Sequence, residues 1–228
     1  MRAAAQRLSE RLRRTGRLAR RRKQIKAYLS DHSVRKLQLG TGDNALYGWL
    51  NTDIHDFTGR NEIVYLDARR PFPFPDNAFD VVFSEHMIEH IDYAGGVRCF
   101  RECHRILRPG GRIRIATPSL ERLIRLYDAE PTDLQRRYLR WAFESFVEDA
   151  DAPLPGYVVN NFVRAWGHRF IYDEQTLRRG LEAAGFDDVE ARALGDSGDE
   201  RLRGLERHMS EVEEFNAYET IVLEARRP

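Results

Sequence analysis

The chain of 228 residues is 42% hydrophobic and 32% charged, which is the balance of a globular protein with a sizeable core. No apolar run approaches the roughly 20 residues that a membrane-spanning helix needs, and the N-terminus lacks the apolar stretch of a signal peptide. The two cysteines, Cys99 and Cys103, suit buried helix packing in a reducing compartment better than a disulfide. We therefore expect a cytoplasmic protein.

The net charge of +1 hides a strongly basic N-terminal arm. Residues 1–30 hold eleven arginines and lysines against one acid, Glu10, so the arm carries +10 and residues 31–228 carry −9. Its apolar residues lie roughly along one helical stripe, formed by Leu8, Leu12, Leu18, Ile25 and Leu29. Such a basic amphipathic helix lies on an anionic membrane, touches nucleic acid or packs its stripe on the domain. A transit peptide has a similar composition.

Beyond the arm, short apolar runs alternate with helical patterns, as in a parallel α/β sheet. The predicted strands are 36–39, 49–54, 62–66, 79–83, 112–116, 189–194 and 218–225. Helices are expected over 96–107 and 173–184 and through most of 119–166. Pro109, Gly110 and Gly111 should end the first of these helices and turn the chain into the next strand.

The first strand runs into Gly40-Thr41-Gly42-Asp43-Asn44-Ala45, which has the G-x-G-x-x-A form of dinucleotide sites. Glycines here allow a tight turn and a close approach of ligand to backbone. A dinucleotide site also needs a helix facing the pyrophosphate and an acid about 20 residues further on. Asp53 lies only eleven residues after Gly42, with hardly room for a helix between. The spacing disfavours a nicotinamide or flavin and fits a smaller adenosine ligand.

Four segments, in the right order and spacing, resemble class I S-adenosylmethionine-dependent methyltransferases of the type 11 kind. They are KLQLGTG (36–42), GWLNTDI (48–54), LDARRPFPFPDNAFDVVFSEHMIEH (66–90) and ECHRILRPGGRIRIATP (102–118). The resemblance covers residues 35–226, weakly over the last two strands. It implies a Rossmann-like α/β fold, with a seven-stranded, mostly parallel sheet flanked by helices. The methyltransferase domain would be 31–228, with a helical acceptor-side insertion at about 119–170.

The same resemblance implies S-adenosylmethionine as cofactor. Gly40 and Gly42 would lie under its amino-acid end, and Asp53 would accept hydrogen bonds from both ribose hydroxyls. Asp67 and the backbone of Ala68 would hold the adenine. The full set of expected cofactor-binding residues is Leu39, Gly40, Thr41, Gly42, Asp53, Ile54, Asp67, Ala68, Ser84 and Glu85. Thr41 departs from the family, which often has cysteine there. Taken singly, the two aspartates are equally consistent with ordinary turn residues at strand ends.

Residues 86–90 spell H-x-x-E-H, a zinc-hydrolase signature. A protease is disfavoured, because the string follows the fourth strand of an open sheet, where ligands bind, and does not lie on a long helix. His86, Glu89 and His90 would share one face of a helical turn. The string resembles the E-x-x-E-H of metal-dependent O-methyltransferases, whose RNA-methylating members add a later H-x-F-x-W. This chain has His168-Arg169-Phe170-Ile171-Tyr172 in the corresponding place.

The resemblance therefore implies a metal site of His86, Glu89, His90 and His168. His86 replaces a glutamate of those families, which favours Zn²⁺, Mn²⁺ or Fe²⁺ over Mg²⁺. Two alternatives stay open. His168, His86 or His90 acts as a catalytic general base without metal, or the histidines are purely structural.

For the acceptor we expect the hydroxyl of a sugar, glycan or glycolipid. Small methyltransferases resembling this one are often associated with polysaccharide and glycolipid assembly, and the amides and aromatic rings of the insertion suit a sugar ring: Asn160, Asn161, Trp166 and Tyr172. The basic arm suggests peripheral membrane contact, whereas nucleic acid is disfavoured because the rest of the chain is acidic. The rivals are metal-free N- or O-methylation of a small metabolite and an inert binding protein on this fold. The oligomeric state stays open.

Overall fold

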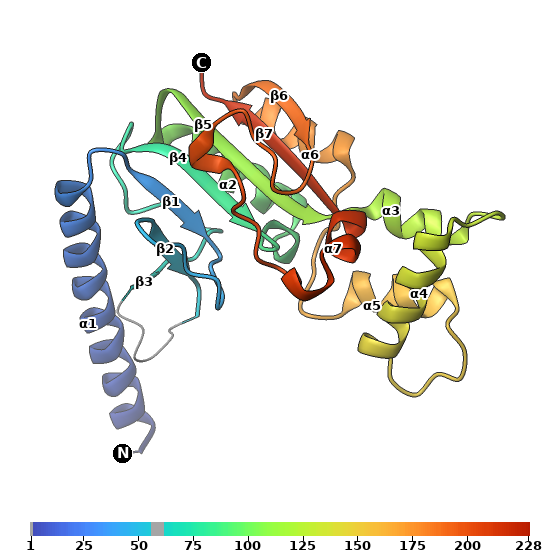
Figure 1. The fold of residues 1–228 in the computed structure, drawn as a ribbon. Helices are drawn as coiled ribbons and strands as arrows, with labels where there is room; N and C mark the ends of the chain where they lie inside the picture. The colour runs from blue at the N-terminus through green and yellow to red at the C-terminus, as the bar shows by residue number, and fades with distance from the viewer. Residues whose placement is uncertain (1, 56–61) are drawn as a thin grey trace.

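Seven strands form one sheet in the order β3-β2-β1-β4-β5-β7-β6 in the computed structural model, which describes residues 2–55 and 62–228 and their side chains from residue 16 onwards (Figure 1). The strands are β1 Lys36–Leu39, β2 Leu50–Asp53, β3 Ile63–Tyr65, β4 Phe79–Glu85, β5 Leu107–Pro118, β6 Asp187–Arg192 and β7 Thr220–Arg226. Only β7 runs antiparallel to its neighbours, β5 and β6. The predicted Rossmann-like, mostly parallel sheet is confirmed.

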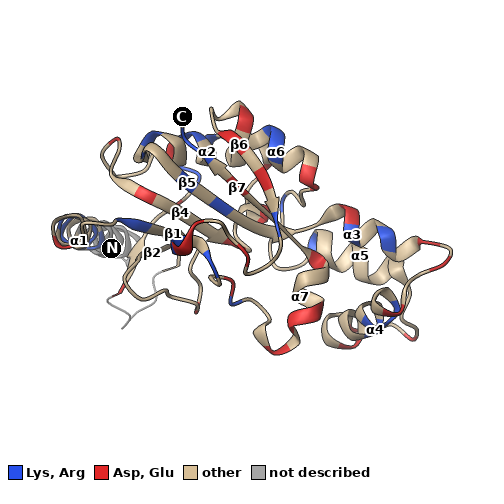
Figure 2. Ribbon diagram, turned by 45° about the horizontal axis from the view of Figure 1, so that its top comes forward, with Lys and Arg blue, Asp and Glu red and all other residues tan. Residues whose placement is uncertain are grey.

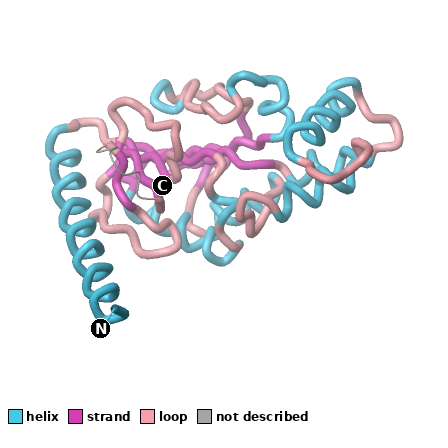
Figure 3. The backbone as a smooth tube through the Cα atoms, turned by 90° about the horizontal axis from the view of Figure 1, so that it is seen from below, coloured by secondary structure: helices cyan, strands magenta, loops and turns pink. Residues whose placement is uncertain are grey.

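The helices are α1 Arg2–Asp31, α2 Tyr93–Ile106, α3 Leu120–Ile124, α4 Asp133–Phe146, α5 Pro155–Arg164, α6 Glu174–Ala183 and α7 Glu213–Glu219. The described residues also form the 3₁₀ turns η1 Ile88–His90, η2 Arg125–Tyr127, η3 Glu200–Leu202 and η4 Ser210–Val212. In Figure 2, α1 lies at one side of the sheet, and α3, α4 and α5 gather beyond the carboxyl end of β5. Figure 3 shows helices and loops on both faces of the sheet. None of the described helices is both long and apolar enough to cross a bilayer.

Successive side chains of the central strand β4 point to opposite faces of the sheet, and nearly all of them are buried. The strand is therefore covered on both faces. Val82 belongs to the main core with residues of α2 and α6. Val81 and Phe83 instead pack against Leu202 and Leu205, which lie in the segment after β6. This segment, residues 193–212, therefore covers the face of the sheet opposite α2.

The basic arm is helical, as predicted, and its last turns belong to the main core. Ile25 and Tyr28 are buried there, and the Tyr28 hydroxyl accepts a hydrogen bond of 2.8 Å from the backbone N–H of Lys36. The N-terminal half of α1 projects away from the sheet (Figure 1). The side chains of Leu8 and Leu12, predicted to continue the apolar stripe, lie outside the described residues.

The boundaries of α2 and β5 differ from the prediction. The helix begins at Tyr93 because the Asp92 side chain caps it by accepting from the backbone N–H of Gly95. Its last residue is Ile106, and β5 starts directly at Leu107, which is fully buried and pairs with Phe79. The expected turn at residues 108–111 is thus an irregularity inside a strand longer than the predicted 112–116. Strand β5 starts before the predicted residue 112 because Leu107 is buried and pairs with β4.

A buried ion-pair cluster in β5 ties the 193–212 segment to the sheet. The Arg114 guanidinium is fully buried and donates to Glu206 Oε1 and Glu224 Oε1, each at 2.6 Å. It also donates to the Asp196 carbonyl oxygen at 2.7 Å. Both carboxylates are buried like the guanidinium. If Arg114 were lost, water could therefore not hydrate the two carboxylates in its place.

Arg114→Met should therefore lower the free energy of unfolding by about 3–5 kcal/mol, because it leaves two buried carboxylates without their main partner. Urea unfolding measures this loss. The triple variant Arg114→Met, Glu206→Leu, Glu224→Met should recover most of the stability. Arg137→Met, which removes a solvent-exposed ion pair with Glu214, serves as the control and should lower the free energy of unfolding far less, because water screens the two charges. Equal losses of unfolding free energy in Arg114→Met and Arg137→Met would contradict a stabilising role for the buried ion pairs of Arg114.

Candidate functional site

A cavity of about 310 Å³ opens at the carboxyl ends of β1, β2 and β4. Its floor is the glycine turn after β1, where Gly40 and Gly42 have φ of 66° and 49°. Both are left-handed conformations that favour glycine. A Cβ on Gly40 would lie 2.2 Å from Met87 Cγ, so the close approach of Met87 also requires glycine there. We call this space the first cavity.

Two carboxylates at strand ends line the first cavity. The Asp53 carboxylate, which is largely buried, accepts from the backbone N–H of Gly42 at 3.0 Å and of His55 at 2.8 Å. Asp67 is paired with the side chain of Arg69 at 2.8 Å, and this hydrogen bond lowers the pKa of Asp67. Asp53 is the last residue of β2 and Asp67 follows β3, and these parallel strands end at the same edge of the sheet, which is why the two residues meet here.

Most of the residues expected to bind a cofactor line the first cavity: Leu39, Gly40, Gly42, Asp53, Ile54, Asp67 and Ala68. Thr41, Ser84 and Glu85 are buried outside its lining. The Glu85 carboxylate accepts hydrogen bonds from the backbone N–H groups of Arg207 and His208, at 3.0 and 2.9 Å. The sequence motifs did not indicate several other lining residues, namely His55, Leu66, Arg69, Met87 and Ile91.

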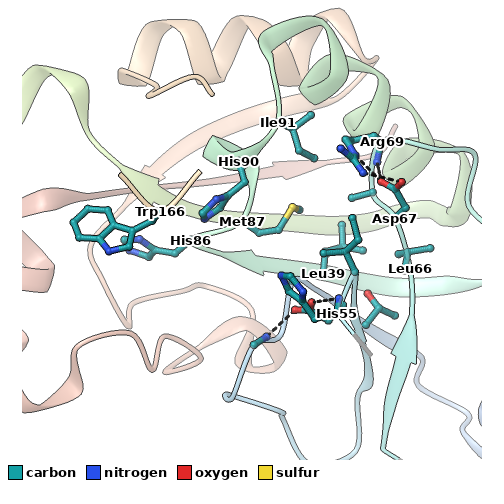
Figure 4. A pocket seen from close by; sticks show the side chains of 16 residues that line it. Leu39, His55, Leu66, Asp67, Arg69, His86, Met87, His90, Ile91 and Trp166 are labelled. Atoms are coloured by element: carbon teal, nitrogen blue, oxygen red, sulfur yellow. Dashed lines mark hydrogen bonds and ion pairs between the residues drawn. The ribbon is translucent and has the colours of Figure 1, made fainter. Parts of the chain in front are cut away.

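A second cavity, of about 510 Å³, adjoins the first and lies between the sheet edge and the helices of the insertion. The two cavities share His86, His90 and Trp166. In Figure 4 these three side chains gather at one end of the first cavity, with Asp67 and Arg69 at the other. Aromatic side chains from the insertion complete the second cavity: Trp141, Phe146 and Phe162.

The other insertion residues expected near the acceptor lie elsewhere. Asn160 donates from its side chain to the Gly156 carbonyl oxygen on the same helix, and Tyr172 is fully buried in the main core. Neither these two nor Asn161 lines the second cavity, so Trp166 alone of the four does. The helical periodicity of α5 turns its asparagines away from the space that Phe162 enters.

The structure brings Glu89, His90 and His168 together, with one possible ligand atom from each within 4.8 Å of the others. Glu89 is fully buried. Its Oε2 accepts from the Thr117 hydroxyl at 3.0 Å, whereas Oε1 has no hydrogen-bond partner. His168 Nδ1 donates to the Phe162 carbonyl oxygen at 2.6 Å, so Nε2 carries the lone pair of the neutral ring. We call these three residues the first triad.

His86 does not share a helical face with Glu89, because the only helical turn here is η1, Ile88–His90. His86 instead adopts φ of 44° at the end of β4, a left-handed conformation that directs its ring differently. Its Nδ1 lies 3.5 Å from Glu89 Oε1, yet its ligand atoms group with those of His208 and Glu219, again within 4.8 Å. We call His86, His208 and Glu219 the second triad. The predicted four-ligand set is thus divided between two groups.

Burial dominates the electrostatics of the second cavity. It lowers the pKa of its four imidazoles, those of His86, His90, His168 and His208. It raises the pKa of Glu89 to about 8 and that of Glu219 to about 7. The imidazoles are therefore neutral near pH 7, with lone pairs available for a proton or a cation.

His208 and Glu219 are two possible metal ligands of the second cavity that the sequence did not indicate. They lie in the C-terminal segment, outside every motif, and Glu219 falls in a stretch predicted as strand. The structure makes it the last residue of α7 and buries its side chain against the Tyr138 hydroxyl, which donates to Glu219 Oε2 at 2.6 Å.

Residues 37–115 match the sequence model of a family described as a methyltransferase domain. A SAM-dependent methyltransferase from Archaeoglobus fulgidus is similar in fold, with a TM-score of 0.51 and 19% identity over 92% of this chain and 93% of that one. The chain has the class I methyltransferase fold. This confirms the predicted family resemblance. The matched segment runs from β1 into β5 and contains the first cavity's strand ends but not the insertion.

Two curated relatives are similar to somewhat more than half of the chain. The demethylmenaquinone methyltransferase of Clavibacter sepedonicus is 32% identical over 139 residues, which are 59% of this chain and 50% of that protein. The ubiquinone/menaquinone biosynthesis C-methyltransferase UbiE of Proteus mirabilis is 28% identical over 138 residues, 59% of this chain and 49% of that protein. This chain thus spans about half the length of the curated relatives it matches.

Proposed function

We propose that this protein is an S-adenosylmethionine-dependent methyltransferase that holds the cofactor in the first cavity and a methyl acceptor in the second. The observation that carries the proposal is that the two cavities meet at His86, His90 and Trp166. Methyl transfer requires the nucleophile to face the sulfonium methyl directly, in line with the bond that breaks. Adjoining cavities with a common wall meet that requirement.

The first cavity suits the polar groups of the cofactor. The Asp53 carboxylate already accepts from two backbone N–H groups, and an ionised carboxylate has about four lone-pair sites, so capacity remains for ribose hydroxyls. The glycine turn brings the backbone within reach of the amino-acid end of the cofactor. The Asp67 carboxylate accepts three hydrogen bonds from Arg69 and one from the exposed Arg70 side chain, so it would accept from the adenine amine in place of Arg70 while it keeps its ion pair with Arg69.

The histidines suit a hydroxyl as acceptor. A hydroxyl is a poor nucleophile because it holds its proton tightly, and the neutral Nε2 of His168 can accept that proton. The acceptor oxygen then forms a bond to the methyl carbon as the carbon–sulfur bond breaks. The electron pair of that bond stays on sulfur, which gives S-adenosylhomocysteine, and the proton stays on the imidazole.

The first triad also fits a divalent cation. Two imidazoles and one carboxylate suit Zn²⁺, Mn²⁺ or Fe²⁺, and the buried, unpartnered Oε1 of Glu89 is a ready ligand atom. Such an ion, when bound, would make a nearby hydroxyl more acidic and orient it. Glu89, His90 and His168 would hold it, and the Thr117 hydroxyl would fix the Glu89 carboxylate.

We favour a sugar, glycan or glycolipid hydroxyl as the acceptor. The second cavity combines Trp141 and Trp166 with imidazoles and carboxyls, and flat aromatic faces beside polar groups suit a sugar ring. Carbon methylation of an aromatic ring is the second candidate. The name of the Proteus mirabilis relative, a C-methyltransferase of ubiquinone and menaquinone biosynthesis, supports transfer to carbon. The aromatic lining is compatible with either acceptor.

Asp53→Asn should weaken cofactor binding roughly 10- to 100-fold, because hydrogen bonds to a charged group contribute about 1.5–3 kcal/mol. Calorimetric titration with S-adenosylmethionine measures this. Asp133→Asn, which changes an exposed carboxylate at the start of α4, is the control and should bind as the wild type does. Undetectable binding by the wild type at millimolar cofactor would refute the proposed function.

His168→Ala should slow methyl transfer by roughly 10²–10⁴-fold, the usual contribution of a positioned general base, without changing cofactor affinity. The assay follows a panel of nucleotide sugars, glycolipids and hydroquinones, with and without chelator. His32→Ala, at the end of α1, controls for loss of an imidazole elsewhere. Transfer to hydroquinones alone would replace the sugar with the second candidate. A rate that chelator leaves unchanged would remove the cation from the mechanism.

We further propose that the projecting half of α1 binds anionic membrane surfaces. Deleting residues 1–15 should abolish sedimentation with anionic phospholipid vesicles, because it removes five of the eleven basic residues of the arm. The cut spares Ile25 and Tyr28, so cofactor binding should persist. Neutral vesicles are the control. Undiminished binding of the shortened chain to anionic vesicles would contradict the membrane role.

A further inference from the structure

The second triad lies on the wall of the second cavity formed by β4 and α7. His86 comes from the end of β4, His208 from the segment before η4, and Glu219 from the end of α7. The two imidazole rings are stacked, with centroids 3.9 Å apart and planes at 27°. One possible ligand atom from each residue lies within 4.8 Å of the other two.

Buried polar groups hold His208 over His86. The Glu85 carboxylate, adjacent to His86 in the chain, accepts from the backbone N–H groups of Arg207 and His208. The Asn216 side-chain amide donates to the His208 carbonyl oxygen from the other side. The position of His208 is therefore set by two side chains that are themselves buried.

A hydrogen-bonded chain also sets the tautomer of His86. The Thr220 hydroxyl donates to Asn216 Oδ1 at 2.8 Å, so its oxygen is left to accept from His86 Nε2–H at 3.2 Å. The lone pair of His86 is then on Nδ1, which lies 3.5 Å from the unpartnered Oε1 of Glu89. Imidazoles that bind metals usually donate their other N–H to an oxygen in this manner. The unprotonated Nδ1 of His86, a residue of the second triad, thus lies beside Glu89 of the first triad.

The composition and burial of the group point to a cation. Like the first triad, it offers two imidazoles and one carboxylate, a set that binds Zn²⁺ and Fe²⁺ and leaves open positions for another ligand. Glu219 is almost fully buried, and its Oε2 is oriented by the Tyr138 hydroxyl.

We infer that His86, His208 and Glu219 hold a second divalent transition-metal ion, so that the second cavity is a two-ion site together with the first triad. The role of this ion rests on the proposed function. Two ions facing one cavity would hold two neighbouring oxygens of the acceptor, which selects vicinal diols such as those of sugars.

Equilibrium dialysis of the metal-stripped, full-length protein against Mn²⁺ tests the inference directly. The wild type should bind two ions per chain. His208→Ala and Glu219→Gln should each halve this to one, and His90→Ala should also leave one. His32→Ala, the matched histidine control, should still bind two. Mn²⁺ electron paramagnetic resonance should show coupling between the two ions in the wild type and its loss in Glu219→Gln.

A count of one or none for the wild type at millimolar Mn²⁺ would overturn the second ion, as would two ions in both His208→Ala and Glu219→Gln. Glu219→Gln has nearly the shape of the wild type and can still accept from Tyr138, so its count remains valid even where His208→Ala does not fold. Cofactor binding, measured separately by calorimetry, needs neither ion. A failure of the two-ion site is therefore distinguishable from a failure of the proposed methyltransferase.

Discussion

Parallel pairing of β1 with β2 on one side and with β4 on the other brings three strand ends to a single edge of the sheet. The glycine turn, the Asp53 carboxylate and His86 each follow one of these ends. Their proximity is a consequence of backbone hydrogen bonding, and it does not require any contact between the side chains themselves. The first cavity, and the wall it shares with the second, depend on this pairing.

The second cavity depends on a different kind of contact. Its far wall comes from the C-terminal segment, which is held by buried charges: Glu85 accepts from the backbone at 207–208, and Arg114 binds Glu206 and Glu224. These groups are protected from water, so their hydrogen bonds are strong and their loss is costly. The sheet edge thus supplies the part of the site within the segment that matches the methyltransferase-domain family, and buried polar contacts supply the part outside that segment.

Sequence reasoning predicted the strands and the first cavity well, because both follow from local patterns. Short runs rich in apolar residues predict β1 and β2, and Gly40 and Asp53 stand where those two strands end. It was less accurate where burial overrides a local signal. The Pro-Gly-Gly string was expected to separate helix from strand, yet β5 begins before it because Leu107 is buried.

The resemblance to metal-dependent O-methyltransferases implied the gathering of Glu89, His90 and His168. The sequence by itself determined the sheet and the adenosine-type spacing between the glycine turn and Asp53. These features depend on periodicity and on the order of strands, which the chain carries locally. Only the tertiary structure decided that Glu85 anchors a distant segment and that His86 faces His208 and Glu219. Those contacts join residues more than 120 positions apart, through a left-handed backbone at His86 and a loop without any motif. No local sequence pattern predicts these long-range contacts, because they depend on how the whole chain packs.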